Sequence, residues 1–136
     1  MAETLLVTGA AGFIGANFVH YWLARHPGDR VIAYDALTYA GNRASLAALE
    51  GDPRFTLVVG DIRDERPLAQ LLRDEGVDVL VHFAAESHVD RSISGPDAFI
   101  ETNVVGTHSL LKAARAAWLA GDGRAHRFHH VSTDEV

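Results

Sequence analysis

"TGAAGFIG", residues 8–15, places three glycines where an apolar segment gives way to a helical pattern. Gly9 permits a tight turn, Gly12 lets the backbone approach a pyrophosphate, and Gly15 lets the following helix pack close to the sheet. The free N–H groups at the start of that helix would then face phosphate oxygens. A glycine-rich turn without a ligand is the alternative, because a lone glycine motif is a weak signal.

Apolar runs and helical patterns alternate along the whole chain. The patterns predict strands over residues 3–9, 30–35, 55–61, 77–85 and 127–133, helices over residues 13–26, 66–76 and 95–121, and a loop with a short helix over residues 36–51. The strands are nearly continuous apolar runs, which is typical of a parallel sheet covered by helices on both faces. We therefore predict a single α/β domain over residues 1–136. Its fold is a Rossmann-type doubly wound parallel sheet with strand order 3-2-1-4-5.

Composition narrows the class of protein. The chain has 136 residues, 48% of them hydrophobic, with a formal charge of −6 and no cysteine. This apolar content suits one globular domain, and the acidic balance argues against a nucleic-acid partner. Without cysteine, neither a disulfide nor a thiolate metal site can form. Since no signal-like start or membrane-length apolar stretch occurs, we expect no membrane association and a cytoplasmic location.

A carboxylate ends the second predicted strand. Asp35 lies 20 residues after Gly15, where it can accept hydrogen bonds from the hydroxyls of an adenosine ribose. The same carboxylate would repel a 2′-phosphate, which favours NAD over NADP as cofactor. The alternative is an ordinary turn residue at a strand end.

The motifs together resemble a known family. The glycine spacing is GxxGxxG, and further along the chain stand "DALTYAGN", "GDIRD", "HFAAESHVDRSI", "ETNVVGT" and "FHHVSTDEV". This set resembles the extended short-chain dehydrogenase/reductase family and, within it, the dTDP-glucose 4,6-dehydratases. Sugar-nucleotide epimerases share the first motif, whereas "AAESHVDRSI" and "STDEV" are similar to the dehydratases. The resemblance runs over the whole chain and implies only the amino-terminal part of such an enzyme, so we expect a sheet truncated after its fifth strand.

The resemblance implies a set of NAD contacts. These are Gly9, Gly12, Phe13, Ile14, Gly15, Asp35, Thr38, Asp61, Ile62, Ala84, Ala85, Glu86, Ser87 and Thr102. Phe13 and Ile14 would line the pyrophosphate, and a position in the core would be compatible with that role. Asp61 and Ile62 would hold the adenine, although an aspartate here is also a common turn residue. The segment from Ala84 would run beneath the cofactor, and Thr38 would lie on the adenosine side.

Two adjacent carboxylates near the end of the chain are the implied catalytic pair. Loss of water from a 4-keto sugar needs a base at C5 and an acid at the C6 hydroxyl, and two carboxyl groups in different environments can supply both. By resemblance Asp134 is the acid, Glu135 is the base, and Thr133 binds the C4 oxygen of the substrate. Ser87 would also reach the substrate. The alternative is that "DE" merely opens a loop or caps a helix.

The expected activity is conversion of dTDP-glucose to dTDP-4-keto-6-deoxyglucose and water, by C4 oxidation, elimination and hydride return to C6. The family's catalysis also needs a Tyr and a Lys four residues later, and no such pair occurs here. We therefore expect the 136-residue piece alone to be inactive. Two alternatives remain open: another nucleotide-sugar 4,6-dehydratase or a 4-epimerase, and a non-enzymatic dinucleotide-binding module.

Two further expectations concern metals and partners. His129 and His130 are neighbours in a predicted strand, so their side chains point to opposite faces and cannot bind one ion together. No metal site is predicted. By resemblance, the long helix around residues 104–118 would pair with a second copy, which gives a homodimer in the full-length form.

Overall fold

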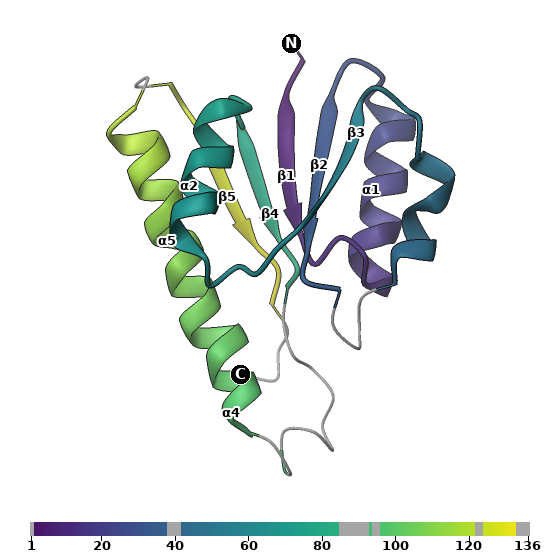
Figure 1. The fold of residues 1–136 in the computed structure, drawn as a ribbon. Coiled ribbons are helices and arrows are strands. Elements are labelled where there is room, and N and C mark those ends of the chain that lie inside the picture. Colours follow the sequence, from purple (N-terminus) through teal and green to yellow (C-terminus); the bar gives the residue numbers. More distant parts are fainter. Residues whose placement is uncertain (1, 38–41, 85–92, 94–95, 122–123, 133–136) are drawn as a thin grey trace.

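Five parallel strands form one sheet in the order β3-β2-β1-β4-β5, which confirms the predicted fold (Figure 1). The computed structural model describes residues 2–37, 42–84, 93, 96–121 and 124–132. The strands are β1 (Thr4–Thr8), β2 (Arg30–Asp35), β3 (Phe55–Val59), β4 (Val79–His82) and β5 (Arg127–His130). The order reverses at β1, because the chain moves outward through β2 and β3 and then crosses to β4 on the other side.

Helices cover both faces of the sheet. Helix α1 (Phe13–Arg25) and the 3-10 helix η1 (Arg43–Leu49) lie on one side, and α2 (Glu65–Asp74) and α5 (Thr107–Ala114) lie on the other (Figure 1). The strand side chains alternate between the two faces, as a pleated strand requires. Thus Leu6 packs in the core beneath α2 and α5, whereas Leu5 and Val7 pack in the core beneath α1.

The helix predicted over residues 95–121 is one long helical run. It consists of α4 (Pro96–Phe99), the π-helical segment η2 (Ile100–Gly106), α5, and the π-helical segment η3 (Arg115–Leu119). Leu110 and Ala113 on its inner side are fully buried. Within the described ranges, no helix combines the length and the apolarity that a bilayer span requires.

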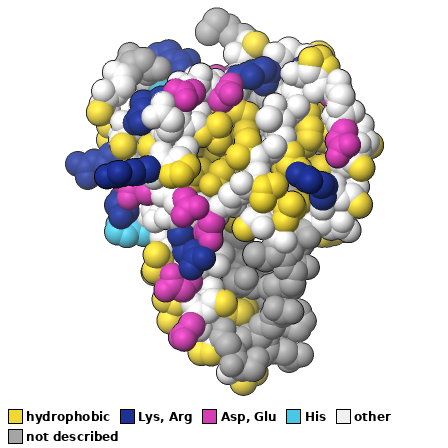
Figure 2. Space-filling model, viewed as in Figure 1, with side chains coloured by type: hydrophobic (Ala, Val, Ile, Leu, Met, Phe, Trp, Pro, Cys, Tyr) yellow, Lys and Arg dark blue, Asp and Glu magenta, His cyan; other side chains and the backbone are white. Residues whose placement is uncertain are grey.

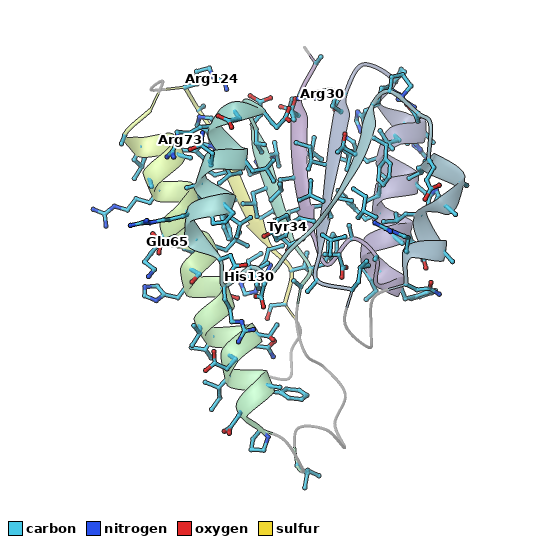
Figure 3. The ribbon with its side chains drawn as sticks, in the orientation of Figure 1. Arg30, Tyr34, Glu65, Arg73, Arg124 and His130 are labelled. Carbon is cyan, nitrogen blue, oxygen red and sulfur yellow. The ribbon has the colours of Figure 1, made fainter. Side chains whose placement is uncertain are left out.

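On the face that Figure 2 shows, Lys and Arg side chains lie beside Asp and Glu side chains. Lys112 on α5 pairs with Glu65 on α2 at 3.2 Å. At the amino end of the sheet, Arg124 pairs with Asp78 at 2.6 Å. Figure 3 shows Arg30 and Arg124 at this end, and His130 toward the opposite, carboxyl end of the sheet.

Candidate functional site

The carboxyl ends of the strands meet at one edge of the sheet because the strands are in register. Thr8 on β1 pairs with Tyr34 on β2 and with His82 on β4, and His82 pairs in turn with His130 on β5. The residues that follow these strand ends therefore lie together. This edge is where open α/β sheets bind ligands, beside the point at which the strand order reverses.

The glycine-rich loop is built for close backbone approach. Gly9 has φ +67°, and a Cβ atom there would lie 2.6 Å from the nitrogen of Ala84. A Cβ atom on Gly15 would collide with the carbonyl oxygen of Gly9 and lie 3.0 Å from the Cα of Ala10. Both positions thus require glycine, as predicted from the spacing.

Helix α1 begins with its N–H groups directed at this edge. Its N-cap is Gly12, which has no side chain to accept a hydrogen bond from the first turn. The first turn therefore remains available to an anion. Phe13 and Ile14 are 83% and 65% exposed, so neither is a core residue.

Asp35 is buried and fixed by two main-chain donors. Its side chain is 8% exposed. Oδ2 accepts a 2.8 Å hydrogen bond from the N–H of Ala11, and Oδ1 accepts a 2.7 Å bond from the N–H of Leu37. Each carboxylate oxygen can accept a further hydrogen bond, so the side chain can shape its strand end and also receive ribose hydroxyls.

Asp61 and Ile62 follow β3 and differ in which of their groups a ligand can reach. The Arg63 side chain donates hydrogen bonds to the Asp61 carboxylate, and this holds the pKa of Asp61 below its ordinary value. The Asp61 carbonyl accepts a 3.0 Å bond from the Tyr34 hydroxyl, whose pKa burial raises to about 12. The Ile62 side chain is 6% exposed and belongs to the core, so only its backbone is available to a ligand at this edge.

A buried histidine that the sequence patterns do not single out joins the site to the long helix. His82 Nδ1 lies 2.7 Å from Thr8 Oγ1, and its Nε2 lies 2.8 Å from Thr107 Oγ1. Thr8 Oγ1 also accepts a 3.3 Å bond from the N–H of Ala84. The pKa of His82 is lowered to about 4, mainly by burial and to a smaller extent by the nearby His130, so the ring is neutral at pH 7. The signal in the sequence is one polar residue in the apolar strand "VLVH".

The remaining predicted residues lie partly outside the described part of the chain. Thr102 is half-buried in η2, beside Glu101. The predicted site residues that lie outside the described ranges are Thr38, Ala85, Glu86, Ser87, Thr133, Asp134 and Glu135. Among the residues that are described, no three His, Asp or Glu side chains group in a way that could hold a metal ion.

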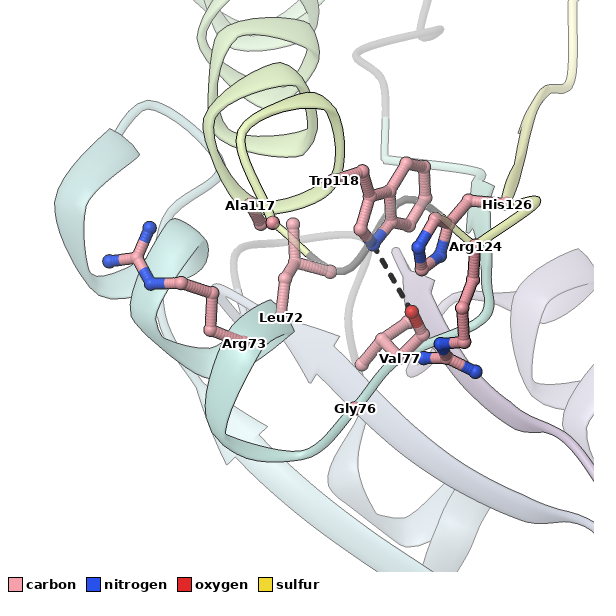
Figure 4. A pocket seen from close by; sticks show the side chains of 9 residues that line it. Leu72, Arg73, Gly76, Val77, Ala117, Trp118, Arg124 and His126 are labelled. Atoms are coloured by element: carbon pink, nitrogen blue, oxygen red, sulfur yellow. Dashed lines mark hydrogen bonds between the residues drawn. The ribbon is translucent and has the colours of Figure 1, made fainter.

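A separate pocket of about 190 Å³ lies at the other end of the sheet (Figure 4). Gly76 and Val77, just before β4, line it together with Arg124 and His126, just before β5. Trp118 closes one wall: its Nε1–H donates a 3.1 Å bond to the Val77 carbonyl, and its ring stacks on His126 at 4.6 Å. This pocket is remote from the glycine-rich loop.

Comparison with known proteins assigns the chain to a family. The family model described as GDP-mannose 4,6 dehydratase matches residues 6–136. The chain is 57% identical over 136 residues to a dTDP-glucose 4,6-dehydratase of Xanthomonas campestris pv. campestris (strain B100), covering 98% of this chain and 38% of that protein.

Solved structures give the same grouping. A dTDP-glucose 4,6-dehydratase of Streptomyces venezuelae, crystallised with NAD bound, superimposes with a TM-score of 0.80 at 59% identity, over 85% of this chain and 36% of that one. A UDP-glucose 4-epimerase of Stenotrophomonas maltophila with bound NAD superimposes with a TM-score of 0.76 at 28% identity, over 85% and 34%.

The chain spans less than two-fifths of the length of these relatives. The matches nevertheless cover nearly all of the chain itself, and they confirm the resemblance that its motifs indicate. The chain belongs to the GDP-mannose 4,6 dehydratase family.

Proposed function

We propose that this chain is the NAD-binding part of a dTDP-glucose 4,6-dehydratase. The proposal rests on one observation: the N–H of Ala11, in the glycine-rich loop, donates a 2.8 Å hydrogen bond to the buried carboxylate of Asp35. The identities of 57% and 59% to dehydratases, against 28% to the epimerase, favour the dehydratase over the epimerase alternative.

The residues of the carboxyl edge fit the dinucleotide. The N-terminus of α1 and the Gly9–Gly12 turn would hold the pyrophosphate, and Asp35 would accept the ribose hydroxyls. Asp61 and the backbone of Ile62 would hold the adenine. Ala84 and the residues after it, together with Thr38 and Thr102, complete the proposed contacts. NAD, when bound, would accept a hydride from C4 of the sugar and return it to C6.

Three residues beyond β5 would act on the sugar. Thr133 would hold the C4 oxygen, Glu135 would take the C5 proton, and Asp134 would protonate the departing C6 hydroxyl. Ser87 would contact the substrate from the segment after β4. The opposite protonation states of the two carboxyl groups require environments that separate their pKa values. The Tyr and Lys of the family and the nucleotide-sugar site would lie in other parts of the protein, and a cytoplasmic location fits this reaction.

The test combines binding with product analysis. Calorimetry with this chain should show NAD binding, and the protein that carries the chain should convert dTDP-glucose to the 4-keto-6-deoxy sugar. A 4-epimerised sugar as product would support the epimerase instead. NAD binding without any turnover of nucleotide sugars would support a non-enzymatic module.

The long helix carries the proposed homodimer contact. Ile100, Val104 and Leu111 are 56%, 63% and 47% exposed, and their spacings of four and seven residues place them on one side of the helix. A second copy that presents the same stripe would bury these side chains. In sedimentation, Val104→Glu should shift the protein that carries this chain toward monomer, whereas Tyr21→Glu on α1 should leave its mass unchanged. A dimer that survives Val104→Glu would contradict this contact.

A further inference from the structure

The segment Asp61–Arg63 is held at its backbone by two neighbouring elements. The Tyr34 hydroxyl, from β2, donates to the Asp61 carbonyl at 3.0 Å, and the Ser109 hydroxyl, from α5, donates to the Arg63 carbonyl at 3.3 Å. Between them the Ile62 side chain fills the space beside Gly106, where a Cβ atom would lie 2.6 Å from Ile62 Cδ1. None of these three contacts uses the Arg63 side chain, so its removal should leave the backbone in place.

The Arg63 side chain instead fixes the direction of the Asp61 carboxylate. Its Nε lies 3.1 Å from both carboxylate oxygens, and its Nη2 lies 2.7 Å from Oδ2. The main-chain N–H of Arg63 adds a 2.9 Å bond to Oδ1. Three N–H groups thus make four contacts, two on each carboxylate oxygen. Because Nε–H is shared between the two oxygens, it can bond to one of them alone and leave one of the about four acceptor positions to another donor. The Asp61 side chain is 34% exposed, so that position is open to a ligand.

The far side of the guanidinium is tied to the long helix. Arg63 Nη1 lies 3.4 Å from Glu101 in η2. The side chains of Arg63 and Glu101 are 46% and 51% exposed. Exposed ion pairs contribute little to the stability of a fold. Stability therefore does not explain why the Asp61–Arg63–Glu101 network lies at the edge of a ligand site.

We propose that Arg63 is a positioning residue that aims the Asp61 carboxylate at the 6-amino group of adenine and so selects adenine in the dinucleotide. The inference rests on the proposed function, since it needs NAD to bind at this edge. A planar guanidinium that donates hydrogen bonds to both oxygens fixes the rotation of the carboxylate, whereas a single donor group does not.

The test compares two ligands that differ at the 6-amino group. NAD carries adenine, and nicotinamide hypoxanthine dinucleotide carries an oxygen in place of that amino group. Calorimetry would give the Kd of both ligands for the unsubstituted protein, for Arg63→Met, and for Arg66→Met as a matched loss of charge on the exposed side of α2. Arg63→Met should weaken NAD by about three- to tenfold and leave the hypoxanthine analogue within about twofold, and Arg66→Met should change neither.

A substitution cycle separates positioning from a general loss of charge. In an Asp61→Asn background, Arg63→Met should weaken NAD no further, because the group that it positions has changed. Equal weakening of both dinucleotides by Arg63→Met, or the same loss in the Asp61→Asn background, would overturn the inference. An unsubstituted protein that binds both dinucleotides equally would also overturn it while leaving NAD binding intact. A protein that binds neither would instead overturn the proposed function and, with it, this inference.

Discussion

The main-chain N–H of Ala11 lies 2.8 Å from Oδ2 of Asp35, so the glycine-rich loop and the end of β2 form one hydrogen-bonded unit. The second carboxylate oxygen is held at 2.7 Å by the N–H of Leu37, a residue with φ +56°. A non-glycine residue in this region is uncommon and needs support from its surroundings. Asp35 therefore stabilises the turn that follows it as well as the loop beside it.

Replacement of Asp35 should affect both stability and cofactor choice. An asparagine offers one acceptor oxygen to two N–H donors, so Asp35→Asn should lower the free energy of unfolding by about 1–3 kcal/mol. It should also narrow the preference for NAD over NADP, which we expect to be on the order of tenfold or more in the unsubstituted protein. Urea unfolding and calorimetry measure the two effects, and Asp97→Asn at an exposed position serves as control. Equal affinity of the unsubstituted protein for NAD and NADP would contradict the role of Asp35.

A comparison of Gly9 with Gly51 distinguishes the stability cost of backbone strain from the cost of a steric collision. Gly9 and Gly51 have φ +67° and +89°, but a Cβ atom on Gly9 would lie 2.6 Å from Ala84 N, whereas one on Gly51 would meet nothing within 4 Å. Gly51→Ala should cost about 1 kcal/mol through its backbone conformation alone. Gly9→Ala should cost roughly 3 kcal/mol or more, because the chain must also move. Thermal or urea unfolding gives both values, and equal losses would show that the loop can move away from Ala84 without cost.

Acid should weaken the fold through His82. Burial lowers its pKa from 6.5 to about 4, so between these pH values the unfolded chain takes up a proton that the folded protein excludes. Stability from this group is complete above about pH 6.5 and is lost as the pH falls toward 4, by on the order of 3 kcal/mol. Urea unfolding at a series of pH values should show this slope, and His82→Gln should flatten it.

The pH window of His82 is separate from that of the carboxylates. The pKa of Asp61 is lowered from 3.8, so its contribution is lost only at lower pH. The difference between the unsubstituted protein and His82→Gln therefore reports on the histidine. Identical pH dependence of the two proteins from pH 4 to 7 would show that His82 accepts a proton in the folded state at its ordinary pKa.

The adjacent carboxylates should be separable by their kinetics. In the protein that carries this chain, Asp134→Asn and Glu135→Gln should each slow elimination by roughly a hundredfold or more, because each removes one acid or base. NAD affinity should stay nearly unchanged. Glu135→Gln should also suppress exchange of the C5 hydrogen with solvent, which mass spectrometry in deuterium oxide measures. Normal elimination by both variants would mean that the pair belongs to a loop without a catalytic part.

Local patterns were sufficient to predict the sheet and part of the candidate site. The alternation of apolar runs with helical patterns predicts a parallel sheet covered on both faces, because parallel strands need crossover connections and these have one favoured hand. The glycine-rich turn after the first strand adds the dinucleotide-binding strand order, which is the one observed. Gly9 and Asp35 stand at fixed places relative to a strand end, so their positions follow from spacing alone. The strand boundaries differ from the prediction: the fourth strand is predicted over residues 77–85, but β4 runs only from Val79 to His82, because its partner β1 ends at Thr8.

Contacts between distant parts of the chain could not be predicted in this way. His82 bonds to residues 74 and 25 positions away, and no local period links those three positions. Arg63 stands in a turn where an arginine is unremarkable, and its relation to Glu101 depends on how the long helix packs against α2. The contacts of His82 and Arg63 form only when the fold brings distant elements together, so local sequence patterns do not contain them.

The contact between Ile62 and Gly106 has a consequence for related sequences. A Cβ atom at position 106 would lie 2.6 Å from Ile62 Cδ1, and the two positions belong to segments that approach each other only in the folded protein. Natural variation at these two positions should therefore be correlated. Because Ile62 Cγ1 would also lie 2.8 Å from such an atom, an alanine or serine at 106 should appear together with a side chain that lacks γ carbons, such as alanine, at 62, and pairings of a large residue at both positions should be rare.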